Sequence, residues 1–266
     1  MEDRLRQAYL EAMGIESWVP RRPGANPPAG DIPSAAGLPQ ETVSVEPDAD
    51  DGPPVWLDEV PPPTEEWMSV EMPETVPAAA DNTASLDWSA LENRVSQCTA
   101  CELHAGRQHT VFGVGDRSAD LMVIGEAPGA EEDRQGEPFV GRAGQLLNAM
   151  LLAIGLHREQ VYIANILKCR PPGNRDPRPE EALRCEPFLL RQVALVRPRV
   201  IFAAGGVAAQ NLLKSQEAVG KMRGRAFQFE GIPVVVSYHP AYLLRSPDQK
   251  AKAWQDLQRL VGILKA

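Results

Sequence analysis

The chain reads Leu121-Met122-Val123-Ile124-Gly125-Glu126-Ala127-Pro128-Gly129 near the middle of its 266 residues. The apolar run predicts a buried strand, and the glycines, carboxylate and proline that follow it predict a loop at the carboxyl end of that strand. Three further apolar runs predict strands of the same kind, at 161–167, 200–204 and 234–238. The sequence therefore predicts a sheet built from strands that are buried on both faces.

Helical periodicity separates these runs. Helices are predicted at 144–154, 179–196, 207–213 and 251–264, and another begins at Ser85 or Asp87 and ends near Gln97. Apolar strands that alternate with helices are typical of parallel sheets covered on both sides. We therefore expect an α/β fold, a three-layer α/β/α domain with a mainly parallel, four-stranded central sheet.

The first third of the chain has a different composition. Residues 1–87 carry 18 acidic and 4 basic side chains, a net charge of −14, so residues 88–266 carry +5 of the total of −9. Proline runs such as 61–63 disfavour both helix and sheet, so we expect a disordered acidic linker over 19–84. A short amphipathic helix is predicted over 3–13, which either packs on its own domain or docks on a partner protein through the linker. The predicted domains are an arm, 1–84, and a folded domain, 85–266.

The chain gives no sign of a membrane protein. It has no run of 18 apolar residues, and its start lacks the basic and apolar segments of a signal peptide. We expect a cytoplasmic protein, and a monomer, because nothing predicts a self-complementary surface. The mildly basic charge of 88–266 suits a domain that contacts phosphates.

Three polar loops follow predicted strands, at the edge where sheets of this kind bind ligands. The first, 125–144, is rich in glycine and carboxylates but lacks the Gly-Lys-Ser/Thr of a phosphate-binding loop. The second starts at Asn165, whose amide offers one acceptor and two donors and suits either a base edge or a turn. The third starts at His239, and a single histidine there is more often structural than catalytic.

Four cysteines are spaced as Cys98-x2-Cys101, then Cys169 and Cys185. A reducing compartment disfavours disulfides, and a CxxC pair in such a chain usually marks a metal or redox site. Four thiolates suit either structural zinc or a 4Fe–4S cluster, and the spacing alone leaves both open.

Taken together, the three loops resemble the motifs of family-4 uracil-DNA glycosylases over about residues 88–266. The resemblance implies a uracil-DNA glycosylase-like fold and a monofunctional enzyme that flips uracil out of DNA, hydrolyses its N-glycosidic bond and leaves an abasic site for base excision repair. It also assigns the four cysteines to a structural 4Fe–4S cluster. Two other functions compete: a uracil-binding module without turnover, and a nucleotide- or phosphate-binding α/β protein with zinc.

The resemblance also implies roles for individual residues. Phe139 would stack on the flipped uracil, the amide of Asn165 would pair with its polar edge, and His239 would donate to the oxygen that gains charge. Glu126 and Glu132 would place the water or stabilise the cationic sugar. Family-1 enzymes have an aspartate that activates water at the position that is Ala127 in this chain. The alanine implies a strongly dissociative mechanism. The implied uracil-binding set is Ala127, Phe139, Asn165 and His239.

Contacts to DNA are expected from two places. Basic residues surround Cys169 in a loop that contacts phosphates or is simply a solvated charged loop. A turn after His239 would enter the stack where the base came out. The expected contacts are Lys168, Arg170, Asn174, Arg175, Leu243, Leu244 and Arg245.

Overall fold

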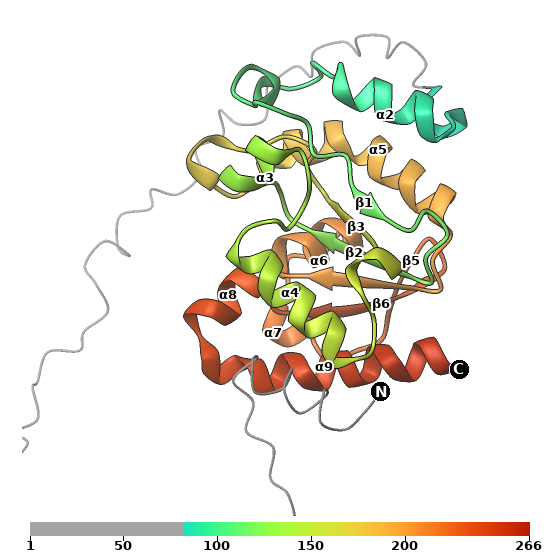
Figure 1. The fold of residues 1–266 in the computed structure, drawn as a ribbon, viewed down its shortest axis with the longest axis vertical. Helices are drawn as coiled ribbons and strands as arrows, with labels where there is room; N and C mark the ends of the chain where they lie inside the picture. The colour runs from blue at the N-terminus through green and yellow to red at the C-terminus, as the bar shows by residue number, and fades with distance from the viewer. Residues whose placement is uncertain (1–81) are drawn as a thin grey trace, which may run out of the picture. The chain divides into compact units, whose positions relative to one another are not determined.

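The computed structural model describes residues 82–266, drawn in colour in Figure 1. The predicted helix at 3–13 and the predicted linker up to residue 81 lie outside these residues. Within the described range, no helix is both long and apolar enough to cross a membrane.

A mixed sheet forms the centre of the domain. Across residues 82–266 it has six strands in the order β1-β3-β2-β4-β6-β5. Four are parallel: β2 (Leu121–Gly125), β3 (Tyr162–Asn165), β4 (Val200–Ala204) and β6 (Ile232–Ser237). β1 (Val114–Gly115) and β5 (Phe227–Phe229) pair antiparallel at the two edges. The four parallel strands are confirmed, but the sheet is wider than predicted because edge strands of two or three residues leave no readable pattern.

Helices cover both faces of this sheet, as Figure 1 shows. The side chains of β2 alternate between them: Met122 and Ile124 pack with helices α2 (88–96), α5 (179–196) and α6 (206–213), whereas Leu121 and Val123 pack with α4 (142–153), α8 (240–245) and α9 (250–265). The predicted three-layer α/β/α architecture is therefore confirmed. The helices are α2 (Trp88–Ser96), α3 (Ala130–Gln135), α4 (Arg142–Ala153), α5 (Pro179–Val196), α6 (Gly206–Leu213), α7 (Val219–Met222), α8 (Pro240–Arg245) and α9 (Lys250–Lys265).

Short 3-10 turns join these elements: η3 (Asn82–Ser85), η4 (Glu102–Ala105), η5 (Arg158–Gln160), η6 (Pro172–Asn174) and η7 (Pro247–Gln249). Thr83 in η3 is only 1% exposed, so the folded part includes residues before the predicted boundary at 85. α2 begins after Asp87, whose carboxylate accepts the Ala90 N–H at 2.8 Å, which decides between the two predicted caps. The short helices α3, α7 and α8 were not predicted; the first and last lie within the first and third loops.

Candidate functional site

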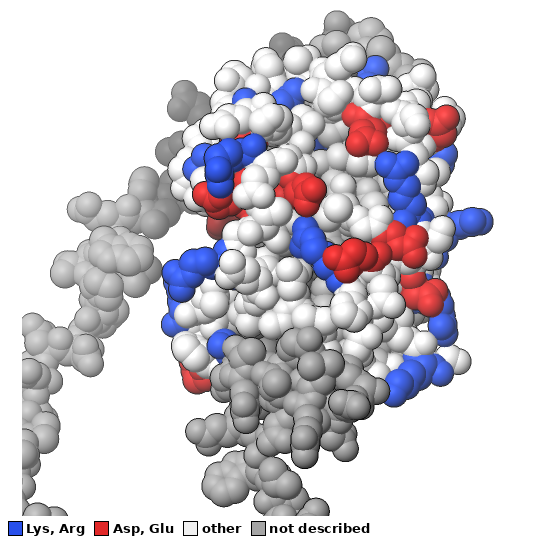
Figure 2. Space-filling view, viewed as in Figure 1, with Lys and Arg blue, Asp and Glu red and all other residues white. Residues whose placement is uncertain are grey.

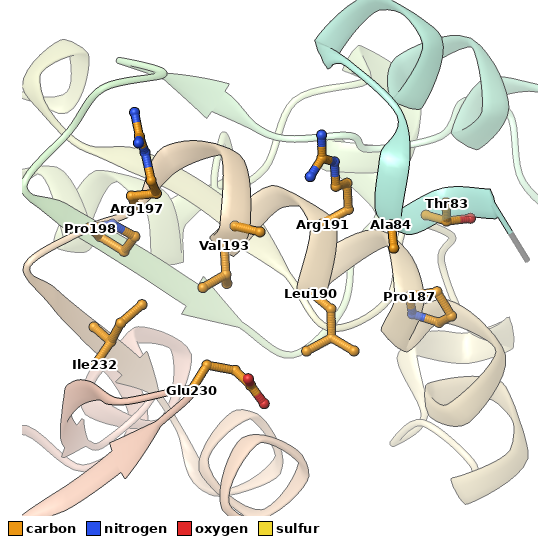
Figure 3. A pocket seen from close by; sticks show the side chains of 11 residues that line it. Thr83, Ala84, Pro187, Leu190, Arg191, Val193, Arg197, Pro198, Glu230 and Ile232 are labelled. Carbon is orange, nitrogen blue, oxygen red and sulfur yellow. The ribbon is translucent and has the colours of Figure 1, made fainter.

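One large cavity among residues 82–266 does not lie at the loops that the sequence singled out. A groove of about 660 Å³ runs between α5 and the β5–β6 hairpin, with Leu190 and Val193 on one side and Ile232 on the other (Figure 3). Pro198 lies just before β4 and Ile232 begins β6, so the groove lies at the amino ends of these strands. Ligands of parallel sheets bind at the opposite edge.

A second cavity, of about 400 Å³, lies at the carboxyl ends of β2, β3 and β6. It gathers the side chains predicted to act on the base, although they come from three loops that are separate in the sequence. The residues brought together are Glu126, Ala127, Glu132, Phe139, Asn165 and His239, with Asn174, Arg175 and Arg245 nearby; the sequence reasoning missed Asp176 and Tyr242.

Asn165 and Phe139 lie against the same small residue. Asn165, the last residue of β3, is 2% exposed, and its Oδ1 has no hydrogen-bond partner within residues 82–266. A Cβ on Gly125 would lie 2.4 Å from that oxygen and 2.6 Å from the Phe139 ring, so only glycine permits the approach. Because buried acceptors in native proteins are nearly always bonded, a free one in a cavity indicates a ligand that brings an N–H or O–H group.

The Phe139 loop is held in an unusual conformation. Phe139 has φ 54°, a left-handed value that costs an ordinary residue about 1–2 kcal/mol. Glu132 stabilises the loop: its Oε1 accepts the N–H groups of Val140 and Gly141 at 2.9 and 3.1 Å, and its Oε2 accepts that of Gly129 at 3.2 Å. Both carboxylate oxygens thus bind backbone N–H groups, and Glu132 holds the loop that carries Phe139. Its predicted role in placing water or stabilising the cationic sugar stays a prediction.

His239 faces the cavity as a neutral ring. Its Nδ1 accepts the Ala241 N–H at 3.1 Å and so caps α8, and therefore the ring proton belongs on Nε2. Burial, aided by the charge of Arg245, lowers its pKa to about 4. The ring also stacks on Phe139, with centroids 5.6 Å apart. A neutral imidazole with one fixed N–H is suited to donating a hydrogen bond to a developing negative charge.

Glu126 is one of three carboxylate side chains that line the cavity, with Glu132 and Asp176. Burial, and to a smaller extent the nearby charge of Asp176, raise the pKa of Glu126 to about 7. A carboxyl that ionises near neutral pH inside a cleft is typical of a functional site.

Two expected DNA contacts are buried. Lys168 is 1% exposed, and its ammonium donates to the Asn165 carbonyl at 2.9 Å and to Gln192 Oε1 at 2.6 Å, so it does not face a phosphate. Leu243 is 0% exposed in the core between α8 and the sheet, so its predicted place in the DNA stack is wrong for this conformation. Leu244 is half-buried against the same core, whereas Arg245 is exposed.

The remaining basic residues near Cys169 are partly engaged. Arg175 binds the Glu181 carboxylate through two nitrogens, at 2.6 and 2.9 Å, and Arg170 Nε donates to Asn174 Oδ1 at 2.8 Å. Figure 2 shows basic and acidic side chains interspersed on the face in view. The charge available to a phosphate is therefore smaller than a count of arginines suggests.

Tyr242 lies at the cavity and is 37% exposed. Its ring packs on Tyr238, with centroids 5.1 Å apart. The guanidinium of Arg223 lies 4.6 Å from the centroid of the Tyr238 ring and also forms an ion pair with Asp256. This stack holds an exposed aromatic ring in place. The only signal in the sequence was its position in the third loop.

All four cysteines line one small cavity, to which the Cys98–Cys101 pair, Cys169 and Cys185 come from three separate segments of the chain. Arg107 Nη1 donates to Cys169 Sγ at 3.2 Å, and the Lys168 backbone N–H donates to Cys185 Sγ at 3.3 Å. Within residues 82–266, no three His, Cys, Asp or Glu lie close enough to hold a single metal ion. Four thiols on one cavity, two of them receiving N–H bonds, fit the donor set of an iron–sulfur cluster.

Comparison with known proteins agrees with this geometry. The family model described as uracil DNA glycosylase superfamily matches residues 112–258. A type-4 uracil-DNA glycosylase of Archaeoglobus fulgidus is 42% identical over 174 residues, 62% of this chain and 87% of the relative. A second, from Thermotoga maritima, is 40% identical over 179 residues, 66% of this chain and 93% of the relative.

A type-5 uracil-DNA glycosylase of Pyrobaculum aerophilum is also similar, with 35% identity over 146 residues, 48% of this chain and 64% of that relative. The type-4 relatives match at higher identity and over more of their length. The chain therefore belongs to the uracil-DNA glycosylase superfamily, and within it to the type-4 enzymes.

Proposed function

We propose that this chain hydrolyses the N-glycosidic bond of uracil in DNA in the cavity at the carboxyl ends of β2, β3 and β6. The observation that carries the proposal is the buried, unpartnered Oδ1 of Asn165 next to Phe139. A base within a duplex does not reach such a site, so uracil enters by flipping out of the stack. The product is an abasic site, the substrate of later repair steps.

Uracil matches the chemistry of Asn165. Its N3–H would donate to Oδ1, and the side-chain amide would donate to the neighbouring carbonyl oxygen O4. Cytosine presents an acceptor at N3 and a donor at the next position, so it would leave both groups of Asn165 facing like groups. Phe139 adds a stacking surface that accepts any base and contributes affinity rather than selection.

The reaction needs stabilisation of two charges. As the bond breaks, uracil becomes anionic, and the Nε2–H of His239 would donate to its O2; one such donor contributes about 2.7–4 kcal/mol in comparable oxyanion sites. Ionised Glu126 would stabilise the cationic sugar and orient the water that attacks it. Because Ala127 offers no base, we infer that departure of uracil runs ahead of attack by water.

DNA contacts are proposed at the mouth of the cavity. Arg245 and Tyr242 are exposed there, and Arg170 with Asn174 lies on the neighbouring loop. Replacing Arg170 by alanine should lower the slope of log affinity against log salt by roughly 0.9 if it contacts one phosphate. An unchanged slope would assign Arg170 to holding its own loop.

The group proposed for the cysteine cavity is a 4Fe–4S cluster on Cys98, Cys101, Cys169 and Cys185. When bound it would tie the segment before β1 to the loop after β3 and to α5, which is a structural role. Iron and sulfide in equal amounts with visible absorbance would support it, whereas zinc in a colourless protein would replace it. A monomeric state, a cytoplasmic location and a protein partner for residues 1–84 stay predictions.

The activity is tested on a labelled oligonucleotide with one uracil, followed by alkaline cleavage of abasic sites. Asn165→Asp is the matched variant, because it keeps the size of the side chain but replaces the amide donor with an acceptor. We expect cleavage at uracil and not at thymine in the control strand, and a large loss in the variant. Binding of uracil DNA without cleavage by folded, coloured protein would favour the uracil-binding module instead.

A further inference from the structure

We propose that Lys168 is a positioning residue that joins the cysteine cavity to the base-reading Asn165, as an internal cation shared by the two sites. The inference rests on the proposed function, because it assigns Asn165 to uracil. Lys168 is buried and does not make the contact with DNA that the sequence predicted, and the proposal gives it another role.

The contacts of Lys168 reach both sites at once. Its backbone N–H donates to Cys185 Sγ at 3.3 Å, while its ammonium turns back to the Asn165 carbonyl at 2.9 Å. The same ammonium donates to Gln192 Oε1 at 2.6 Å, and Gln192 lies two turns beyond Cys185 on α5. One side chain therefore connects the end of β3 with the helix that carries a cysteine.

The anchor on the α5 side is rigid. Gln192 is 0% exposed, and its Nε2 donates to the Phe112 carbonyl at 2.9 Å and to the Tyr162 hydroxyl at 3.1 Å. Since both ends of its amide are bonded, Gln192 holds the ammonium of Lys168 in one place. The ammonium of Lys168 in turn holds the Asn165 carbonyl.

The position of Asn165 depends on its backbone. No group among residues 82–266 bonds its buried Oδ1, so the side chain is placed by Gly125, by the Phe139 ring and by the backbone to which it is attached. The ammonium of Lys168 and the strand pairing with β2 are the contacts that fix that backbone. Losing the ammonium would leave the carbonyl free to shift at the point where β3 ends.

The charge of Lys168 also needs an explanation. It is buried, its bonds go to neutral oxygens, and among residues 82–266 no carboxylate pairs with it. A buried cation without an anion is costly. The groups that face it are the thiols of Cys185 and Cys169, which become anionic when they bind a metal cluster. The cysteine-bound group is thus the counter-charge of Lys168.

The test uses full-length, cluster-loaded protein with Lys168→Met, which keeps the length of the side chain and removes its charge and donors. Inhibition by free uracil should weaken about tenfold, while the visible absorbance of the cluster is kept. The reduction potential of the cluster should become more negative, because a nearby cation favours the reduced form. The matched control is Arg184→Met, which removes an exposed cation from the same cavity without touching Asn165; its uracil inhibition should not change.

A double-mutant cycle separates positioning from general destabilisation. If Lys168 acts through Asn165, adding Lys168→Met to Asn165→Ala should cost little further uracil affinity. Should Lys168→Met not yield loaded protein, Gln192→Leu removes one acceptor of the ammonium and should weaken uracil inhibition several-fold with little change in potential. Unchanged uracil inhibition in either folded variant, or additive losses in the cycle, would overturn the proposal. Inactive wild-type protein would instead refute the proposed function.

Discussion

The pH dependence of the reaction should be governed by Glu126. Burial and Asp176 raise its pKa from 4.5 to about 7, so it is about one tenth ionised at pH 6 and about nine tenths at pH 8. If the anionic form stabilises the cationic sugar, kcat/KM should rise nearly tenfold per pH unit below 7 and level off above it. His239 titrates near 4 and does not contribute in this range.

Two variants test whether Glu126 causes the rise in kcat/KM below pH 7. Glu126→Gln should abolish the rise and leave a low rate that does not depend on pH. Asp176→Asn should move the rise to lower pH, because one of the two causes of the raised pKa of Glu126 is gone. Single-turnover rates on a single-stranded uracil oligonucleotide, from pH 5 to 9 at constant ionic strength, measure both. A rise in kcat/KM below pH 7 that persists in Glu126→Gln would refute the assignment of the pH dependence to Glu126.

Stability supplies an independent check on the same carboxyl. Because its native pKa is raised, the native state holds a proton that the unfolded state releases between pH 4.5 and 7, so stability is lost as pH rises through this window. Glu126→Gln removes that loss. The variant should be more stable than the wild type at pH 8 and about equal to it below pH 4.5, measured by urea unfolding. If Glu126→Gln were less stable than the wild type at pH 8, the ionised Glu126 would have to be stabilised by other groups in the native state.

Replacing Glu132 by alanine should raise KM on the order of tenfold, since three backbone N–H groups lose their acceptor and Phe139 loosens; a change confined to kcat would contradict this. Tyr242→Ala should lower activity on double-stranded DNA more than on single strands, because a duplex must be opened at the mouth of the cavity, where the Tyr242 ring is exposed. Tyr242→Phe is the control, and an equal loss on both substrates would argue against this reason. Arg223→Met should lower the melting temperature by about 10 °C, because it removes the guanidinium that binds both carboxylate oxygens of the buried Asp256, at a cost of about 3–5 kcal/mol. Calorimetry measures the shift, and a change under 2 °C would show that water reaches the carboxylate.

The layers of the fold were readable because they depend on local patterns. β4 and α5 begin and end at the predicted residues, since both are bounded by proline or glycine; β4 is an unbroken apolar run, and α5 has strong helical periodicity. The edge strands of the sheet could not be predicted from the sequence. β1 and β5 are strands because they pair with β3 and β6, which lie elsewhere in the sequence, and a segment of two or three residues is too short to show a strand pattern.

Within the site, the sequence predicted which residues gather but not what their atoms do. The six residues assigned to the base and the sugar do line one cavity. The bonds of Glu132 to the backbone depend on how the loop of Phe139 folds back, and nothing in the order of residues shows whether a carboxylate faces solvent or amide groups. Distance along the chain also hid Asp176, which reaches Glu126 only through the fold.

The errors share one physical cause, which bears on how DNA is held. Lys168 was assigned to the surface by its charge and its basic neighbours, and Leu243 by the family resemblance of its turn, yet the first lies in a buried polar network and the second in the apolar core. Charge and loop context report what a residue can contact, and burial decides whether it does. With Lys168 buried and Arg175 bound to Glu181, the cations left for phosphates among the expected contacts are Arg170 and Arg245. We therefore expect the flipped base in its pocket to contribute more of the affinity than the backbone of the DNA does, which favours a site that selects the damage itself.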